Sequence, residues 1–88
     1  MNTLWTTETI IAEIRRILAN THGMDISQQP DSVSVRELGI DSMQVIDIIM
    51  DMEDVIGQKI KDFDMPHNPT LADVAVMVRR NILAGEHT

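Results

Sequence analysis

Apolar residues recur at helical spacing in two stretches near the ends of this chain. The first stretch begins after Thr6 or Thr7 and extends to about Asn20, and the other begins after Thr70. Thr70 and Asp73 match a variant of the capping box, in which two side chains bond backbone N–H groups at a helix start. Both stretches therefore predict amphipathic helices. Their expected inner faces are Ile10, Ile11, Ile14, Ile17 and Leu18 in the first helix and Leu71, Val74, Ala75, Val78 and Ile82 in the last.

A third apolar stretch predicts a helix from residue 41 to about residue 56, ended by Gly57. Asp41 is a favoured N-cap residue, and Gln44 three residues later completes a capping box. The acids of this helix share one face, because Asp47, Asp51 and Asp54 are spaced i, i+4 and i+7. The expected buried stripe on another face consists of Met43, Ile46, Ile49, Met50 and either Val55 or Ile56.

The segments between these helices predict shorter elements. In the long connection from residue 24 to residue 40, Ser34 and Glu37 match a capping box, so one short helical turn is expected there. Residues 61–64 are expected to form a short third helix, which Pro66 and Pro69 keep from extending. No stretch shows the alternation of a strand. The sequence thus predicts an all-α fold, a small four-helix bundle of three main helices and one short helix.

Composition limits what a chain of 88 residues can do. This length suffices for one domain with a modest core, but not for a roomy enzyme cleft. Hydrophobic residues make up 43% of the chain and aromatic residues only 2%, so the core must be built from Ile, Val, Leu and seven Met. We expect a single domain over residues 1–88, with flexible ends at residues 1–6 and 84–88.

Charge restricts the class of partner. The net charge of −7 argues against nucleic acid or an anionic membrane as the main partner and favours basic protein surfaces. No apolar run reaches the length of a membrane span, and nothing at the N-terminus resembles a signal peptide. The chain has no cysteine and hence no disulfide framework. We expect a cytoplasmic monomer.

The most informative chemistry lies at Ser42, where a loop becomes the acid-rich helix. A helix start offers unpaired backbone N–H groups and a positive dipole end, which suit a phosphate ester. No histidine lies nearby in sequence to act as a base, and Gly39-Ile40-Asp41-Ser42-Met43 is not a Gly-x-Ser-x-Gly elbow. His22, His67 and His87 lack metal-ligand spacing. We therefore expect no catalytic residue and no metal site, and we interpret Ser42 as a modified residue.

The residues around Ser42 resemble the acyl carrier protein family. The similarity rests on Leu38-Gly39-x-Asp41-Ser42 before a large apolar residue, on the apolar and acidic helix behind it, and on Thr70-Leu71-x-Asp73. It implies that Ser42 carries 4′-phosphopantetheine, attached from coenzyme A by a phosphopantetheinyl transferase. The thiol of this arm would hold acyl groups as thioesters. Asp41 would be the aspartate of the attachment motif, and Met43 would replace its usual leucine.

The resemblance also implies what the protein binds. The helix from residue 41 would correspond to the one that partner enzymes read, so we expect acyl-loading and acyl-processing enzymes with basic docking patches. The protein would be a non-catalytic carrier that delivers acyl intermediates to fatty-acid, polyketide or related biosynthetic enzymes. The expected recognition residues are Gln44, Asp47, Asp51, Glu53 and Asp54.

Four alternatives stay open from the sequence. Gln44 stands where many fatty-acid carriers have an acid. This residue and the two prolines, Pro66 and Pro69, leave room for a specialised pathway. The cargo is either acyl or aminoacyl. In a different class, the chain is an acidic helical binding module without a prosthetic group, such as a cation-binding or protein-binding adaptor, although it lacks an EF-hand ligand loop. Arg36 is either a surface residue without a role or a neighbour of the prosthetic phosphate.

Overall fold

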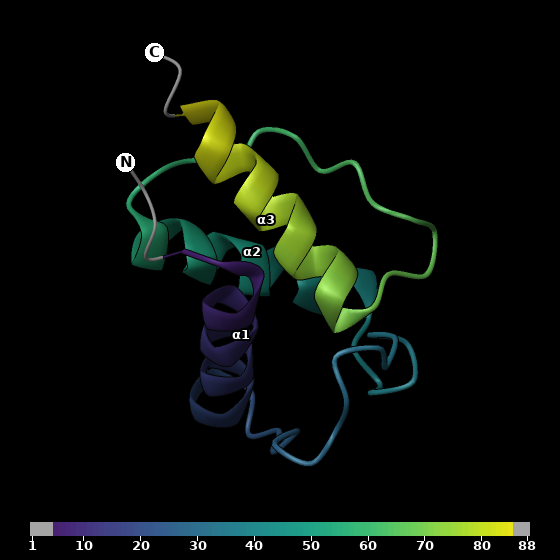
Figure 1. Ribbon diagram of the computed structural model, residues 1–88. Coiled ribbons are helices and arrows are strands. Elements are labelled where there is room, and N and C mark those ends of the chain that lie inside the picture. The colour runs from purple at the N-terminus through teal and green to yellow at the C-terminus, as the bar shows by residue number, and fades with distance from the viewer. Residues whose placement is uncertain (1–4, 86–88) are drawn as a thin grey trace.

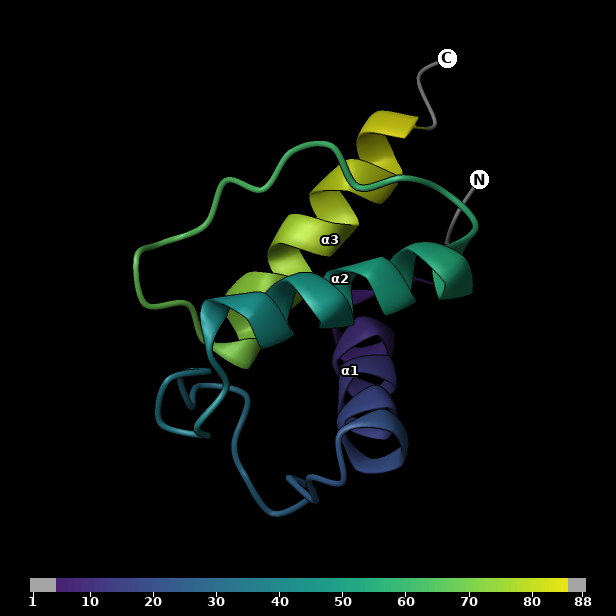
Figure 2. The ribbon, with the colours of Figure 1, turned by 180° about the vertical axis from the view of Figure 1, so that it is seen from behind.

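The computed structural model describes residues 5–85, which fold into three helices without a strand: α1 (Thr7–Thr21), α2 (Ser42–Ile56) and α3 (Leu71–Gly85). α1 packs against both other helices, and α2 and α3 cross one another above it (Figures 1 and 2). None of the helices in the described part is long and apolar enough to cross a membrane. The all-α prediction is confirmed.

The helix starts follow the local signals in the sequence. At α2, the Asp41 carboxylate accepts a hydrogen bond from the Gln44 N–H, and the Gln44 side chain accepts one from the Asp41 N–H. At α3, Thr70 and Asp73 exchange the same pair of bonds. α2 ends at Gly57, whose φ of 74° is a conformation that glycine adopts without a steric penalty. Both predicted capping boxes and the end of α2 are therefore confirmed.

The core confirms the predicted faces of the first and last helices. All the residues named for those faces are buried, together with Met77 of α3. Among the ends expected to be flexible, residues 1–4 and 86–88 lie outside the described residues. Thr6 caps α1 through a capping box with Thr9, and α3 extends through Gly85.

The predicted buried stripe of α2 is wrong for three of its residues. Met43, Ile46 and Met50 are 68%, 48% and 57% exposed, whereas Ile48, Ile49 and Met52 are buried. Only Ile49 of the predicted stripe is buried, and Val55 and Ile56 are half-buried. Apolar residues occur all around this helix, so its period alone does not select the inner face. The helix is instead oriented by α1 and the buried residues that face it.

The expected short helix at residues 61–64 does not form, so the described part of the chain has three helices rather than four. The backbone N–H groups of Lys61 and Asp62 both donate to Asn81 Oδ1 on α3, at 3.0 and 2.9 Å. Because α3 takes up these donors, the chain runs extended here. We call residues 61–69 the crossing segment, because it passes from the end of α2 over the molecule to the start of α3 (Figure 2).

The connection between α1 and α2 is tied to the far end of the crossing segment. Ser34 and Glu37 make the predicted reciprocal hydrogen bonds, and the chain there forms a turn. The Val35 N–H then donates to the Pro69 carbonyl at 2.9 Å, beside an isolated bridge between Ser34 and Thr70. This junction places the start of α2 opposite the crossing segment.

Candidate functional site

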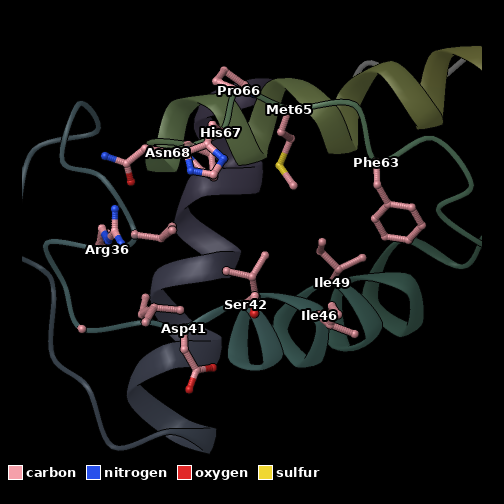
Figure 3. Close-up of a pocket in the computed structure, with 15 residues that line it drawn as sticks. Arg36, Asp41, Ser42, Ile46, Ile49, Phe63, Met65, Pro66, His67 and Asn68 are labelled. Carbon is pink, nitrogen blue, oxygen red and sulfur yellow. The ribbon is translucent and has the colours of Figure 1, made fainter.

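A groove of about 1020 Å³ lies between the start of α2 and the crossing segment. Ser42, Ile46 and Ile49 line it from α2, and Figure 3 shows Phe63 and Met65 on the opposite wall. Arg36, His67 and Asn68 lie toward the Ser42 end of the groove. An exposed hydroxyl and a mostly apolar channel are therefore brought together here.

Ser42 is the first residue of α2 and its side chain is exposed. The preceding N-cap, Asp41, satisfies the N–H of Gln44 at 2.8 Å and leaves the first-turn N–H groups of Ser42 and Met43 without a hydrogen-bond partner in the described structure. These two donors sit at the positive end of the helix dipole. The local geometry thus offers an accessible hydroxyl beside donors that suit an anionic ester.

The loop before Ser42 is held firmly, which fixes where α2 begins. Ile40 is buried and its N–H donates to the Val35 carbonyl at 3.0 Å. Gly39 has a φ of 79°, a left-handed conformation that a residue with a side chain rarely adopts. Leu38 packs against the core. The Leu-Gly-x-Asp-Ser pattern therefore has a structural basis. Leu38 and Ile40 anchor the loop to the core, Gly39 makes the tight turn between them, and Asp41 caps α2.

The crossing segment is anchored to α3 through polar contacts. The Asn81 amide, which is buried, donates to the carbonyls of Asp62 at 2.7 Å and Met77 at 2.9 Å. Arg80 donates to the Asp62 carboxylate at 3.1 Å and to the Asp64 carbonyl at 2.7 Å. A hydrogen bond from the Asp64 N–H, reinforced by Arg80, holds the pKa of Asp62 below its ordinary value. Sequence reasoning missed Asn81, because its role depends on contacts across the fold.

Some of the predicted recognition residues lie on the outer side of α2, and the others make hydrogen bonds within the protein. Asp47 and Asp54 are exposed and Asp51 is half-buried, on the outer side of α2. Gln44 is engaged in the helix cap. Glu53 accepts a hydrogen bond from the Ile60 N–H at 2.8 Å and lies 3.8 Å from Lys59 Nζ, so its carboxylate is used within the protein.

The three methionine and isoleucine side chains expected in the core contribute to this outer surface instead. Met43, Ile46 and Met50 are spaced i, i+3 and i+7, and by helical geometry they lie beside the Asp47 and Asp54 positions. We call this the α2 outer face. It combines an apolar stripe with acids along one edge.

The described residues contain no cluster of three or more His, Asp or Glu side chains that could hold a metal ion. His67 lines the groove near Asn68, a position that the sequence did not single out. His22 is half-buried, and His87 lies outside the described residues.

A helical bundle with an exposed serine at a helix start, beside an apolar groove, is the arrangement of a small carrier domain. The family described as "Phosphopantetheine attachment site" matches residues 12–78. The chain is 30% identical over 78 residues to the acyl carrier protein of an Exiguobacterium species, covering 88% of this chain and 99% of that one. It belongs to the acyl carrier protein family.

Further comparisons agree with this membership. The chain is 28% identical to the acyl carrier protein of Thermotoga maritima, over 85% of this chain and 94% of that one. It is 34% identical to the meromycolate extension acyl carrier protein of Mycobacterium leprae, over 85% and 66% of the two chains. A crystal structure of an acyl carrier protein from Thermotoga maritima superposes with a TM-score of 0.78 at 24% identity, covering 96% of this chain and 98% of that one, which supports the fold.

Family membership confirms several sequence predictions. The protein is a non-catalytic acyl carrier, and its cofactor is 4′-phosphopantetheine. Its partners are a phosphopantetheinyl transferase and acyl-processing enzymes.

Proposed function

We propose that Ser42 Oγ carries the 4′-phosphopantetheine arm and that Asp41 and Met43 complete its attachment motif. The observation that carries this proposal is the exposed serine at the first position of α2, directly after a fully bonded N-cap. Of the other serines in the chain, Ser34 is buried and bonded to Glu37, and Ser27 and Ser32 lie in the connection away from any long helix start.

The residues at this position fit a phosphate-linked arm. The N–H groups of Ser42 and Met43 are free to donate to phosphate oxygens, and the helix dipole favours negative charge there. The Asp41 carboxylate accepts a hydrogen bond from the Gln44 N–H, so it is engaged in the helix cap. When bound, the arm supplies a thiol on which acyl groups are held as thioesters.

The test is the addition of the arm to purified apo-protein. Incubation with coenzyme A and a broad-specificity phosphopantetheinyl transferase should raise the intact mass by one phosphopantetheinyl group. Ser42→Ala should abolish this gain. The matched control is Ser32→Ala, which removes another exposed serine hydroxyl and should be modified at the wild-type rate. Modification of Ser42→Ala would contradict the assignment.

We propose that partner enzymes dock on the α2 outer face. Its apolar stripe supplies a surface that a partner can dehydrate, and Asp47, Asp51 and Asp54 attract basic patches. Gln44 adds an amide at the edge of this surface. Glu53, whose carboxylate already bonds the Ile60 N–H, contributes mainly charge. Acids at the rim raise the association rate and leave dissociation fast, which suits a carrier that visits several enzymes.

Docking is tested with the transferase itself as the partner. Asp47→Asn should slow association several-fold at low ionic strength, and the difference should shrink as salt screens the charge. Glu8→Gln is the matched control, because it removes an equal charge from an exposed position on α1. Equal slowing by both variants would show that net charge matters and the outer face does not.

We further propose that the protein acts as a cytoplasmic monomer in fatty-acid, polyketide or related biosynthesis. The relatives named above are acyl carrier proteins, and one of them is named for meromycolate extension. The acidic surface, with a net charge of −7, disfavours association between copies of the chain. Sedimentation velocity should give a single species of about the chain mass, 9.9 kDa. A larger species would refute the monomer.

A further inference from the structure

We propose that the guanidinium of Arg36 pairs with the phosphodiester of the 4′-phosphopantetheine arm. This inference rests on attachment of the arm at Ser42. Arg36 then acts as a positioning residue, because it fixes the side of α2 from which the arm leaves the protein and does not touch the thioester. Of the two roles that the sequence left open for Arg36, the pairing selects the neighbour of the phosphate.

Arg36 is the arginine whose charge has no partner within the described part of the chain. The other four arginines each donate to a carboxylate or to a carbonyl oxygen. No described residue accepts a hydrogen bond from the Arg36 guanidinium or forms an ion pair with it. In a chain with a net charge of −7, this leaves an uncompensated cation available to an anionic group.

The acids within five residues of Arg36 are all engaged elsewhere. The Glu37 carboxylate accepts a hydrogen bond from a serine hydroxyl at 3.1 Å, and Asp41 accepts one from a backbone N–H at the cap of α2. Asp31 forms an ion pair with Arg15 at 2.8 Å. Each carboxylate is therefore held by a partner other than Arg36, and the guanidinium is left to meet an anion that is added to the protein.

The backbone of Arg36 is fixed near the attachment point. Its carbonyl accepts a hydrogen bond from the Gly39 N–H at 3.0 Å, within the turn that precedes α2. Arg36 and Ser42 both line the groove, and Figure 3 shows Arg36 on the connection that leads to Asp41 and Ser42. Because the Arg36 side chain is exposed and unbonded, it can turn toward a phosphate on Ser42 Oγ without breaking a hydrogen bond.

The charges around α2 favour a phosphate on the side of Arg36. A guanidinium presents a planar set of N–H donors that fits two oxygens of one phosphate group. At 3.6 residues per turn, the three acids proposed for docking lie roughly 120–180° around the helix axis from Ser42. A phosphate drawn toward Arg36 is kept away from these acids, so the α2 outer face stays open to a partner enzyme.

Phosphorus-31 NMR of the purified holo-protein tests the pairing, because it observes the phosphodiester itself. Arg36→Gln should shift the phosphodiester resonance, since the phosphate oxygens lose a charged donor. Arg36→Lys keeps the charge and should recover part of the wild-type position. Lys61→Gln is the matched control: it removes another exposed cation whose side chain has no partner among the described residues, but this residue does not line the groove. Its resonance should stay at the wild-type position.

Salt and thermal unfolding separate an ion pair from a structural role. The Debye length falls from about 30 Å at roughly 0.01 M salt to about 3 Å at roughly 1 M, which weakens an exposed pair. Over this range the wild-type resonance should move toward the position of Arg36→Gln, and the resonance of the variant should move less. The two apo-proteins should have the same Tm, because the substitution breaks no contact of the Arg36 guanidinium within the described structure.

Two results would overturn the pairing. One is a phosphodiester resonance that Arg36→Gln leaves unchanged, and the other is an equal shift in Arg36→Gln and Lys61→Gln, which would reflect net charge alone. Intact mass separates this inference from the attachment on which it rests. A wild-type protein that gains no arm overturns both the assignment of Ser42 and the pairing. A protein that gains the arm on Ser42, but whose resonance does not respond to Arg36, overturns only the pairing.

Discussion

Removal of the Asn81 side chain should destabilise the protein by far more than an ordinary surface substitution. Its amide makes four hydrogen bonds: it accepts from the N–H groups of Lys61 and Asp62 and donates to the carbonyls of Asp62 and Met77. A net worth of about 0.5–1.5 kcal/mol for each bond gives roughly 2–4 kcal/mol, allowing for water that reaches the freed backbone groups. Alanine has a better helix propensity than asparagine, which offsets this loss by about 0.5 kcal/mol.

We therefore expect Asn81→Ala to lower the free energy of unfolding by about 2–3 kcal/mol and the Tm by roughly 10–20 °C. Urea denaturation followed by circular dichroism measures the first quantity, and a thermal scan measures the second. Arg80→Ala is the comparison, because it removes a neighbouring but exposed anchor and should cost under about 1 kcal/mol. If Asn81→Ala unfolds within about 0.5 kcal/mol of wild type, the crossing segment is not held as described.

Three further outcomes follow from the helices and their charges. Met52→Ala should lower the free energy of unfolding by about 2–5 kcal/mol, whereas Met50→Ala should change it by less than about 0.5 kcal/mol in the same urea titration. Asp41→Ala should cost about 1 kcal/mol through loss of the cap, and Asp41→Asn should recover most of it. Because the folded pKa of Asp62 is lowered, its contribution to stability is present above the unfolded pKa of about 3.9 and is lost as pH falls through the folded value. A pH series of urea midpoints should therefore show a smaller acid-side decline in Asp62→Asn.

Local signals in the sequence predicted the helix ends, because caps act within a few residues. α2 begins at the capping box of Asp41 and Gln44 and ends at Gly57. α3 begins at the capping box of Thr70 and Asp73. These signals act whatever packs against the helices. The same local signals placed Ser42 at the start of a helix, where the structure has it. Its position in the fold could therefore be predicted from the sequence, whereas its modification stays a prediction.

The orientation of α2 could not be predicted, because the helix is apolar on more than one side. Periodicity assumes that apolar residues face the core, but Met43, Ile46 and Met50 are exposed. These residues form the surface on which we propose that partner enzymes dock, so the wrong prediction concerns residues with a proposed function. The short third helix failed for another reason: Asn81, some twenty residues away along the chain, takes the N–H groups of Lys61 and Asp62. Such a contact has no local signature.

The central claim is that Ser42 bears an arm whose thiol carries acyl groups. The most direct measurement is the intact mass after incubation with octanoyl-coenzyme A and the transferase, followed by hydroxylamine, which cleaves thioesters. We predict a single gain equal to the octanoyl arm, which peptide mapping places on Ser42, and then loss of the octanoyl group alone while the arm remains. No gain, a gain on another residue, or an octanoyl group that resists hydroxylamine would contradict the claim.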